Sequence, residues 1–149
     1  MSIQINYKAG PSKKKSSNLV LFVDENFNIT GLKKLISNEE YSFIGDLLAI
    51  NDKKKKIIAY DLNSRRRIIL ISIKKKITTS EVEALGAKFY DIFKDIKQNH
   101  FDINSETAKN TLQNFVGYFL HGLRLKSYIF DKYKSKKEKI NLIINILGK

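Results

Sequence analysis

Apolar and polar positions follow two periods along the 149 residues, and their succession predicts strands alternating with helices. Residues 3–7 alternate apolar with polar side chains, as in a half-buried strand. Residues 19–23 form a continuous apolar run, which is typical of a central strand covered on both faces. Two further runs separated by a short turn at Asn63 and Ser64 indicate a hairpin. The predicted strands are residues 3–7, 19–23, 57–60, 67–73, 101–103 and 140–147.

Three other segments carry apolar residues at the spacing of an amphipathic helix. Ser37 and Glu40 predict a capping box at the start of the first. Thr79 or Ser80 is expected to cap the second, and Ser105 is expected to open the third. The predicted buried face of the first helix is Tyr41, Ile44, Leu47 and Leu48. That of the second is Val82, Leu85, Phe89, Ile92, Phe93 and Ile96, and this helix is expected to reach about Gln98. That of the third is Leu112, Phe115, Val116, Phe119, Leu120 and Leu123.

The order of these elements predicts an α/β fold in which helices cover both faces of a mixed sheet, giving three layers. The chain shows no internal repeat and no linker-like segment. We therefore expect a single domain over residues 1–149.

Residue types that carry chemistry are scarce. Cysteine is absent, which excludes disulfides, a thiol nucleophile and Cys-ligated metal sites. His100 is expected after a helix end and His121 on the surface, and the two lack the spacing of a helical metal pair. No phosphate-binding glycine loop and no nucleophile elbow occurs. We predict no catalytic, cofactor-binding or metal-binding residue in this chain.

The N-terminal stretch lacks the apolar region of a signal peptide, and no apolar run approaches the ~20 residues of a membrane span. A cytoplasmic location without a membrane partner is therefore expected.

The net charge of +13 raises nucleic acid as a partner. However, 24 of the 28 basic residues are lysine, and lysine enrichment also arises by compositional drift in an A/T-rich genome. We expect the clusters at 53–56 and 74–76 to lie at one end of the predicted hairpin and 65–67 at the other, which favours drift. The clusters are residues 13–15, 53–56, 65–67, 74–76 and 132–139.

Residues 121–137, HGLRLKSYIFDKYKSKK, are similar to a segment with the pattern G-x-x-L-x-x-Y-x-F-D-x-Y-K-[ST]-K-K. This segment occurs late in the N-terminal domain of the leucyl (cytosol) aminopeptidases, a metallopeptidase family. Residues 18–23, 67–71 and 83–87 resemble the family's first apolar strand, its R-V-L-L-V-G-L-G strand and its R-x-L-G-G helix. The resemblance covers about residues 17–147. The chain departs from it at Ser72, Lys74 and Ala87, where the family usually has glycines.

The resemblance implies a macro-domain-like fold without catalysis in this chain. The family's two divalent metals (Zn or Mn), catalytic lysine and bicarbonate-holding arginine belong to a C-terminal domain. Its N-T-D-A-E-G-R-L motif does not occur here. The implied role is scaffold, assembly or accessory binding, beside the protein's own catalytic domain and within a homo-hexamer of the full-length enzyme.

The alternative is a natural stand-alone basic module that binds nucleic acid or a nucleotide. Macro domains bind ADP-ribose through glycine-rich loops, and the seven glycines of this chain are scattered. Tyr128, Phe130 and Tyr133 alternate with lysines, a pattern that serves either base stacking or docking of a loop. DNA binding is possible on this alternative and is not favoured.

Overall fold

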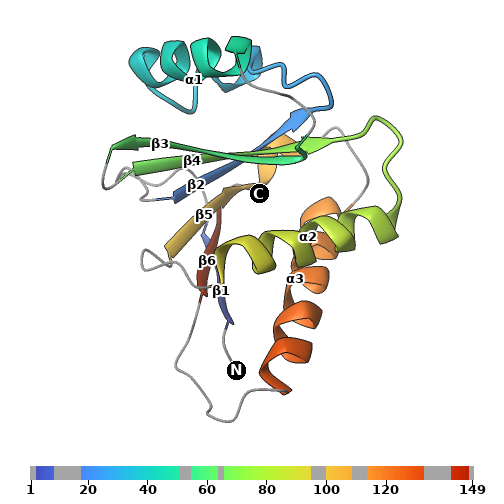
Figure 1. Cartoon of the computed structure of the whole chain (residues 1–149). Coiled ribbons are helices and arrows are strands. Elements are labelled where there is room, and N and C mark those ends of the chain that lie inside the picture. The colour runs from blue at the N-terminus through green and yellow to red at the C-terminus, as the bar shows by residue number, and fades with distance from the viewer. Residues whose placement is uncertain are drawn as a thin grey trace.

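One six-stranded mixed sheet organises the chain (Figure 1). A computed structural model describes residues 3–8, 18–50, 55–63, 66–94, 100–108, 114–132 and 142–147. The strand order is β1-β6-β5-β2-β4-β3, and every neighbouring pair is parallel except the antiparallel hairpin of β3 and β4. The strands are β1 (Ile3–Lys8), β2 (Asn18–Asp24), β3 (Ile57–Asn63), β4 (Arg66–Ile73), β5 (His100–Asn104) and β6 (Leu142–Leu147).

Helices cover both faces of this sheet, which confirms the predicted three-layer α/β class. Helix α1 (Asn38–Ile50) lies on one face, and α2 (Thr79–Phe93) and α3 (Phe115–Lys132) lie on the other (Figure 1). Two short 3-10 helices, η1 (Thr30–Leu32) and η2 (Ser105–Ala108), belong to the connections after β2 and β5.

Strand β2 shows why its position in the sheet requires a continuous apolar run. Val20 and Phe22 point into the core beneath α2 and α3, whereas Leu19 and Leu21 point into the core beneath α1. Because successive strand side chains alternate between faces, a strand buried on both faces must be apolar at every position. The prediction of a central strand here is confirmed.

The core beneath α2 and α3 is built on aromatic contacts. The Phe22 ring meets the rings of Phe115 and Phe119 edge to face, with centroids 5.0 and 5.6 Å apart. Phe89 likewise meets Phe101 at 5.3 Å. Leu85, Phe89, Phe93, Phe115 and Phe119 are all buried, as predicted from the helical stripes.

Two glycines bring α2 and α3 into backbone contact. A Cβ atom on Gly86 would lie 1.9 Å from the carbonyl oxygen of Phe119, and one on Gly122 would lie 1.9 Å from that of Glu83. No other residue type fits at either position without movement of a helix.

Four predictions for α2 and the residues that follow it are wrong. The cap of α2 is Thr78, one residue before the predicted position, and its hydroxyl accepts a hydrogen bond from the Glu81 backbone N–H. The helix ends at Phe93 rather than near Gln98, and Ile92 is half exposed because it lies off the buried stripe. His100 lies within β5, as its first residue.

The third helix also starts later than predicted. Ser105 opens only the short η2, and α3 begins at Phe115. The Thr107 hydroxyl accepts a hydrogen bond from the Phe22 N–H and donates one to the Asn104 carbonyl. These bonds hold η2 against the sheet. The helix α3 then continues through Tyr128, where a docked loop was one expectation.

Other predictions lie outside the described residues. They concern the turn at 10–12, the clusters at 13–15 and 133–139, and Lys53, Lys54, Ser64, Arg65, Ile96 and Leu112.

Candidate functional site

A cleft of about 750 Å³ opens at the carboxyl ends of β2 and β4. The chain leaves β2 toward α1 on one face of the sheet, and it leaves β4 toward α2 on the opposite face. Ligands of open α/β sheets bind at such a divergence, because the two departing segments leave a crevice between them. The loop after β2, the turn after β4 and η2 after β5 form its walls.

The floor of the cleft is apolar. Phe22, Leu32 and Ile73 line it and are each less than 5% exposed. The Thr107 hydroxyl also lines it, and that hydroxyl is already engaged in the two bonds that hold η2.

The rim of the cleft carries both signs of charge. Asp24, Glu25 and Glu106 are its carboxylates. Lys34, Lys74 and Lys75 are its ammonium groups. Asp24, Glu25 and Lys34 belong to the end of β2 and the connection after it, Glu106 follows β5, and Lys74 and Lys75 follow β4, so both signs of charge lie side by side on the rim.

Asp24 shapes the acidic wall. Its Oδ1 accepts hydrogen bonds from the backbone N–H groups of Asn26 (3.1 Å) and Asn28 (2.9 Å). The Phe27 N–H donates to the Asp24 carbonyl, and Phe27 has a left-handed φ of 56° with its ring buried. One carboxylate oxygen of Asp24 therefore stabilises the turn that follows β2.

A carboxylate of the chain itself occupies the N-terminus of α2. Glu81 accepts hydrogen bonds from the Thr78 backbone N–H and hydroxyl, and its other oxygen lies 2.8 Å from the Lys74 Nζ. The hydrogen bond from Lys74, followed by those from Thr78, lowers the pKa of Glu81 to about 2. The same pairing raises the pKa of Lys74. A helix N-terminus is a common phosphate site, and here an internal anion fills it.

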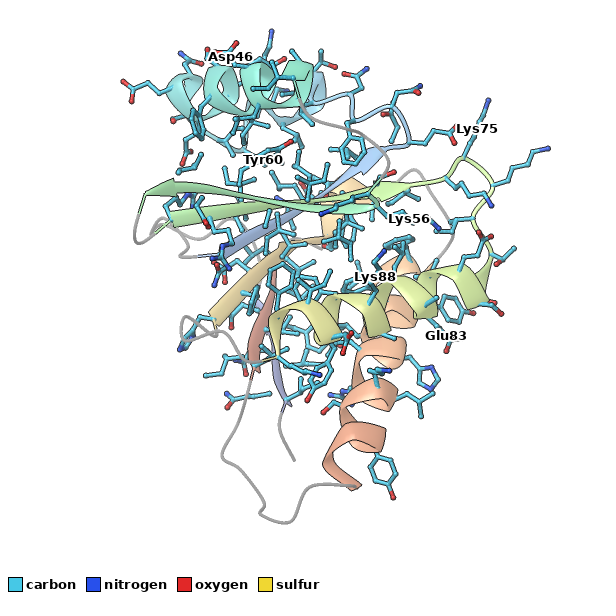
Figure 2. The ribbon with its side chains drawn as sticks, viewed as in Figure 1. Asp46, Lys56, Tyr60, Lys75, Glu83 and Lys88 are labelled. Carbon is cyan, nitrogen blue, oxygen red and sulfur yellow. The ribbon has the colours of Figure 1, made fainter. Side chains whose placement is uncertain are left out.

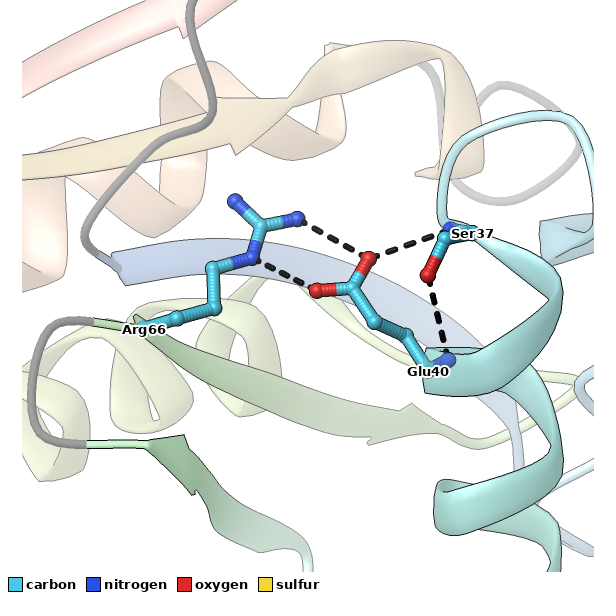
Figure 3. Close-up of polar contacts among 3 residues, drawn as sticks. All are labelled: Ser37, Glu40 and Arg66. Carbon is cyan, nitrogen blue, oxygen red and sulfur yellow. Dashed lines mark hydrogen bonds and ion pairs between the residues drawn. The ribbon is translucent and has the colours of Figure 1, made fainter.

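The same arrangement recurs at the start of α1 (Figure 3). The capping box predicted for Ser37 and Glu40 is present, with Glu40 N–H donating to the Ser37 Oγ and Ser37 N–H donating to Glu40 Oε1. Arg66 Nε then donates to Glu40 Oε2 at 3.0 Å, with both side chains about nine-tenths buried. This arginine belongs to the fold and not to a surface for ligands.

The described members of the hairpin's basic clusters lie where they were predicted. Lys56 and Lys75 lie at the same end of the sheet (Figure 2), and the Ser72 N–H donates to the Lys56 carbonyl across the hairpin. Arg66 and Arg67 begin β4 at the opposite end, where Arg67 pairs with Asp61. The arginine end is thus neutralised by carboxylates. At the lysine end, only Lys74 forms an ion pair within the part of the chain that the structure describes.

Neither histidine lines the cleft. His121 is exposed, as predicted, and its Nδ1 contacts the Glu83 carboxylate across α3 and α2. Within the described ranges, no three His, Asp or Glu side chains converge as metal ligands would. No helix of the described structure is both long enough and apolar enough to cross a membrane.

Sequence reasoning did not find the cleft. Its walls come from three connections that only the strand order brings together, and none contains a recognisable motif. The available signal was Asp24, a polar residue directly after the most apolar strand.

Comparison with solved structures identifies the fold. No protein-family model matches the chain, and no curated protein sequence matches it. A mutant of tomato leucine aminopeptidase superimposes with a TM-score of 0.65 and 17% identity, over 99% of this chain. The chain spans only 32% of that protein's length. The macrodomain of Thermus aquaticus DarG superimposes with a TM-score of 0.63 and 10% identity, over 99% of this chain and all of that one. The fold is therefore that of a macrodomain, as expected.

Proposed function

We propose that this chain is a non-catalytic accessory domain of a longer, leucyl-aminopeptidase-like protein. The observation that carries the proposal is that two glutamates at helix starts are engaged in structural contacts. Glu40 and Glu81 each cap a helix and each bind a cation from an end of β4. These two pairs, one at each end of β4, therefore stabilise the fold. The similarity to the tomato enzyme supports the placement of this chain in a longer protein, since nearly the whole chain superimposes on a third of that enzyme.

The turn after β4 argues against a phosphate-bearing ligand at α2. Lys74 stands where the resembled family usually has glycine, and it binds Glu81 at the helix start. A phosphate approaching this N-terminus would meet the Glu81 carboxylate, and repulsion between the two anions opposes binding. ADP-ribose and other nucleotides are thus disfavoured ligands.

The expected partners follow from the accessory role. They are the protein's own catalytic domain, which would hold the two divalent metals, and further copies of the full-length enzyme in a hexamer. No residue of this chain is assigned to catalysis or to metal. A cytoplasmic location fits this role.

An activity assay tests the absence of catalysis in this domain. We expect the isolated chain to leave leucyl-p-nitroanilide intact, with or without Zn²⁺ or Mn²⁺, because the resemblance assigns the metal ligands to another domain. A full-length leucyl aminopeptidase assayed in parallel is the positive control. Metal-dependent turnover by contaminant-free chain would overturn the proposal.

Nucleic-acid binding is a second candidate, favoured by one observation. Lys55, Lys56, Lys75 and Lys76 lie at one end of the hairpin, and none forms an ion pair with the described residues. Contacts to a nucleic-acid phosphate backbone require exposed positive charges of this kind and do not require side chains that recognise bases. The carboxylates of the nearby rim oppose it, so the accessory role ranks first.

A further inference from the structure

Strand β1 is an edge of the sheet, and among the described residues it pairs with β6 alone. The other edge strand is β3 (Figure 1). Alternate backbone N–H and C=O groups of an edge strand point away from the sheet, where another strand can bind them. An edge strand is therefore a site of association unless some feature of the strand prevents it.

The two edges differ in such features. Charged side chains, proline and β-bulges are the usual means by which proteins prevent edge pairing. Strand β3 contains Asp61, and its pairing with β4 shifts register between Asp61 and Asn63. Strand β1 has no charged residue and no proline from Ile3 to Tyr7, and its pairing with β6 shows no register shift. Of the two edges, β1 is the one open to a further strand.

The side chains of β1 divide between the two faces of the sheet. Ile3 and Ile5 contact the core beneath α2 and α3. Gln4 and Asn6 lie on the opposite face, because successive side chains of a strand alternate. Tyr7 lies on the same face as Ile5, yet it is 75% exposed. A large aromatic side chain thus lies at this edge with little cover.

A second, antiparallel copy of β1 fits this edge. A twofold axis perpendicular to the sheet makes the same patch of both copies meet, and residues of the same face lie opposite one another. With the axis at Ile5, Tyr7 of one copy lies opposite Ile3 of the other, a favourable aromatic and β-branched pair. Gln4 lies opposite Asn6, and two carboxamides can hydrogen-bond because each has donors and an acceptor. This register pairs every residue from Ile3 to Tyr7.

Charge favours contact at β1. Each chain carries a net charge of +13, so two copies repel each other except where they meet at uncharged positions. The stretch from Ile3 to Tyr7 is uncharged. A strand pair of this length lies at the small end of specific interfaces, which begin near ~1,200 Å². The resulting dimer should therefore dissociate on dilution.

We infer that two copies of this chain associate through β1 and form one continuous sheet across a twofold axis at Ile5. The inference goes beyond the proposed function, because the expected hexamer belongs to the full-length enzyme and this dimer is made by the chain itself. Its failure would leave the expected result with leucyl-p-nitroanilide unchanged, so the two can fail separately.

Sedimentation velocity of the whole chain, from about 1 µM to 1 mM, measures the association. We expect the monomer at the lower end and a species of twice 17.2 kDa at the upper end. Gln4→Lys adds an ammonium group at an exposed position of this edge and should give monomer throughout. Ala59→Lys is the matched control, since Ala59 is exposed on the opposite edge, and it should associate as the unmodified chain does.

Single cysteines test the register, because the chain has no cysteine of its own. Cβ atoms directly opposite each other in an antiparallel pair are about 4.5–5.5 Å apart, close to the spacing of a disulfide. Under mild oxidation, Ile5→Cys should form a disulfide-linked dimer. Tyr7→Cys should not, although Tyr7 is the more exposed of the two, because the axis places the two copies of this position at opposite ends of the paired stretch. Circular dichroism checks that each variant is folded.

Three results would overturn the inference. The first is a folded, unmodified chain that stays monomeric at about 1 mM. The second is association that Gln4→Lys leaves unchanged, or that Ala59→Lys abolishes equally. The third is a folded Ile5→Cys variant that cross-links no faster than Tyr7→Cys.

Discussion

At the scale of single residues, two glutamates link a helix start to an end of the same strand. Glu40 binds Arg66 at the beginning of β4, and Glu81 binds Lys74 just beyond its end. Each glutamate also completes a capping box. Because a capping box saturates N–H groups that would otherwise lack partners, each residue stabilises both a helix and its attachment to the sheet.

Glu81 predicts a dependence of stability on pH. Its pKa is lowered from 4.5 to about 2 in the folded chain, so the unfolded chain binds the proton more tightly. The stabilisation is therefore complete above pH 4.5 and is lost as the pH falls toward 2. In urea unfolding, the unmodified chain should be more stable than Glu81→Gln at pH 6, and the difference should shrink below about pH 4.

Glu39→Gln provides the matched control, since Glu39 also lies in a first helical turn but forms no ion pair with the described residues. Its difference from the unmodified chain should vary less over this pH range. A Glu81→Gln difference that stays constant from pH 6 to 2 would contradict the role given to the Lys74 pair.

At the scale of elements, the packing of α2 on α3 depends on glycine. Gly86 and Gly122 allow each helix to reach the backbone of the other. In α1, by contrast, a Cβ atom on Gly45 would meet only the side chain of Ile29, at an ordinary contact distance of 3.9 Å. The first two glycines are thus required by packing, and the third is not.

Alanine substitutions at these glycines should have opposite effects. Gly86→Ala should destabilise the chain by about 1–3 kcal/mol or more, because the added methyl group overlaps the Phe119 carbonyl. Gly45→Ala should stabilise it by roughly 0.5–1 kcal/mol through helix propensity. Denaturant unfolding measures both values. A neutral Gly86→Ala variant would show that the two helices do not meet as described.

At the scale of the whole molecule, sequence patterns predicted the elements that local signals determine. Alternation and apolar runs gave all six strands and the hairpin, and the helical stripes gave Leu85, Phe89 and Phe119 as core. The attachment of η2 to the sheet was not predictable, because Thr107 bonds to Phe22, a residue 85 positions away. The cleft was unpredictable for the same reason, since its walls meet only once the strand order is known.

The lysines at one end of the hairpin predict how the chain should bind DNA. We expect duplex DNA to bind weakly at low salt and to be released near 0.15 M salt, because rim carboxylates lie beside the lysines. Fluorescence anisotropy with a labelled duplex measures this. Binding that persists at about 0.15 M salt, and is lost when Lys55, Lys56, Lys75 and Lys76 become glutamine but not when Lys88 does, would favour the nucleic-acid role instead.

The size of the native gene product tests the central claim most directly. An antibody raised against this chain, applied to an extract of the source cells, should detect a protein about three times as long, matching the 32% share of the tomato enzyme that the chain spans. That protein should co-purify with metal-dependent leucyl aminopeptidase activity. Detection of only a 17.2 kDa product without such activity would contradict the proposal of an accessory domain.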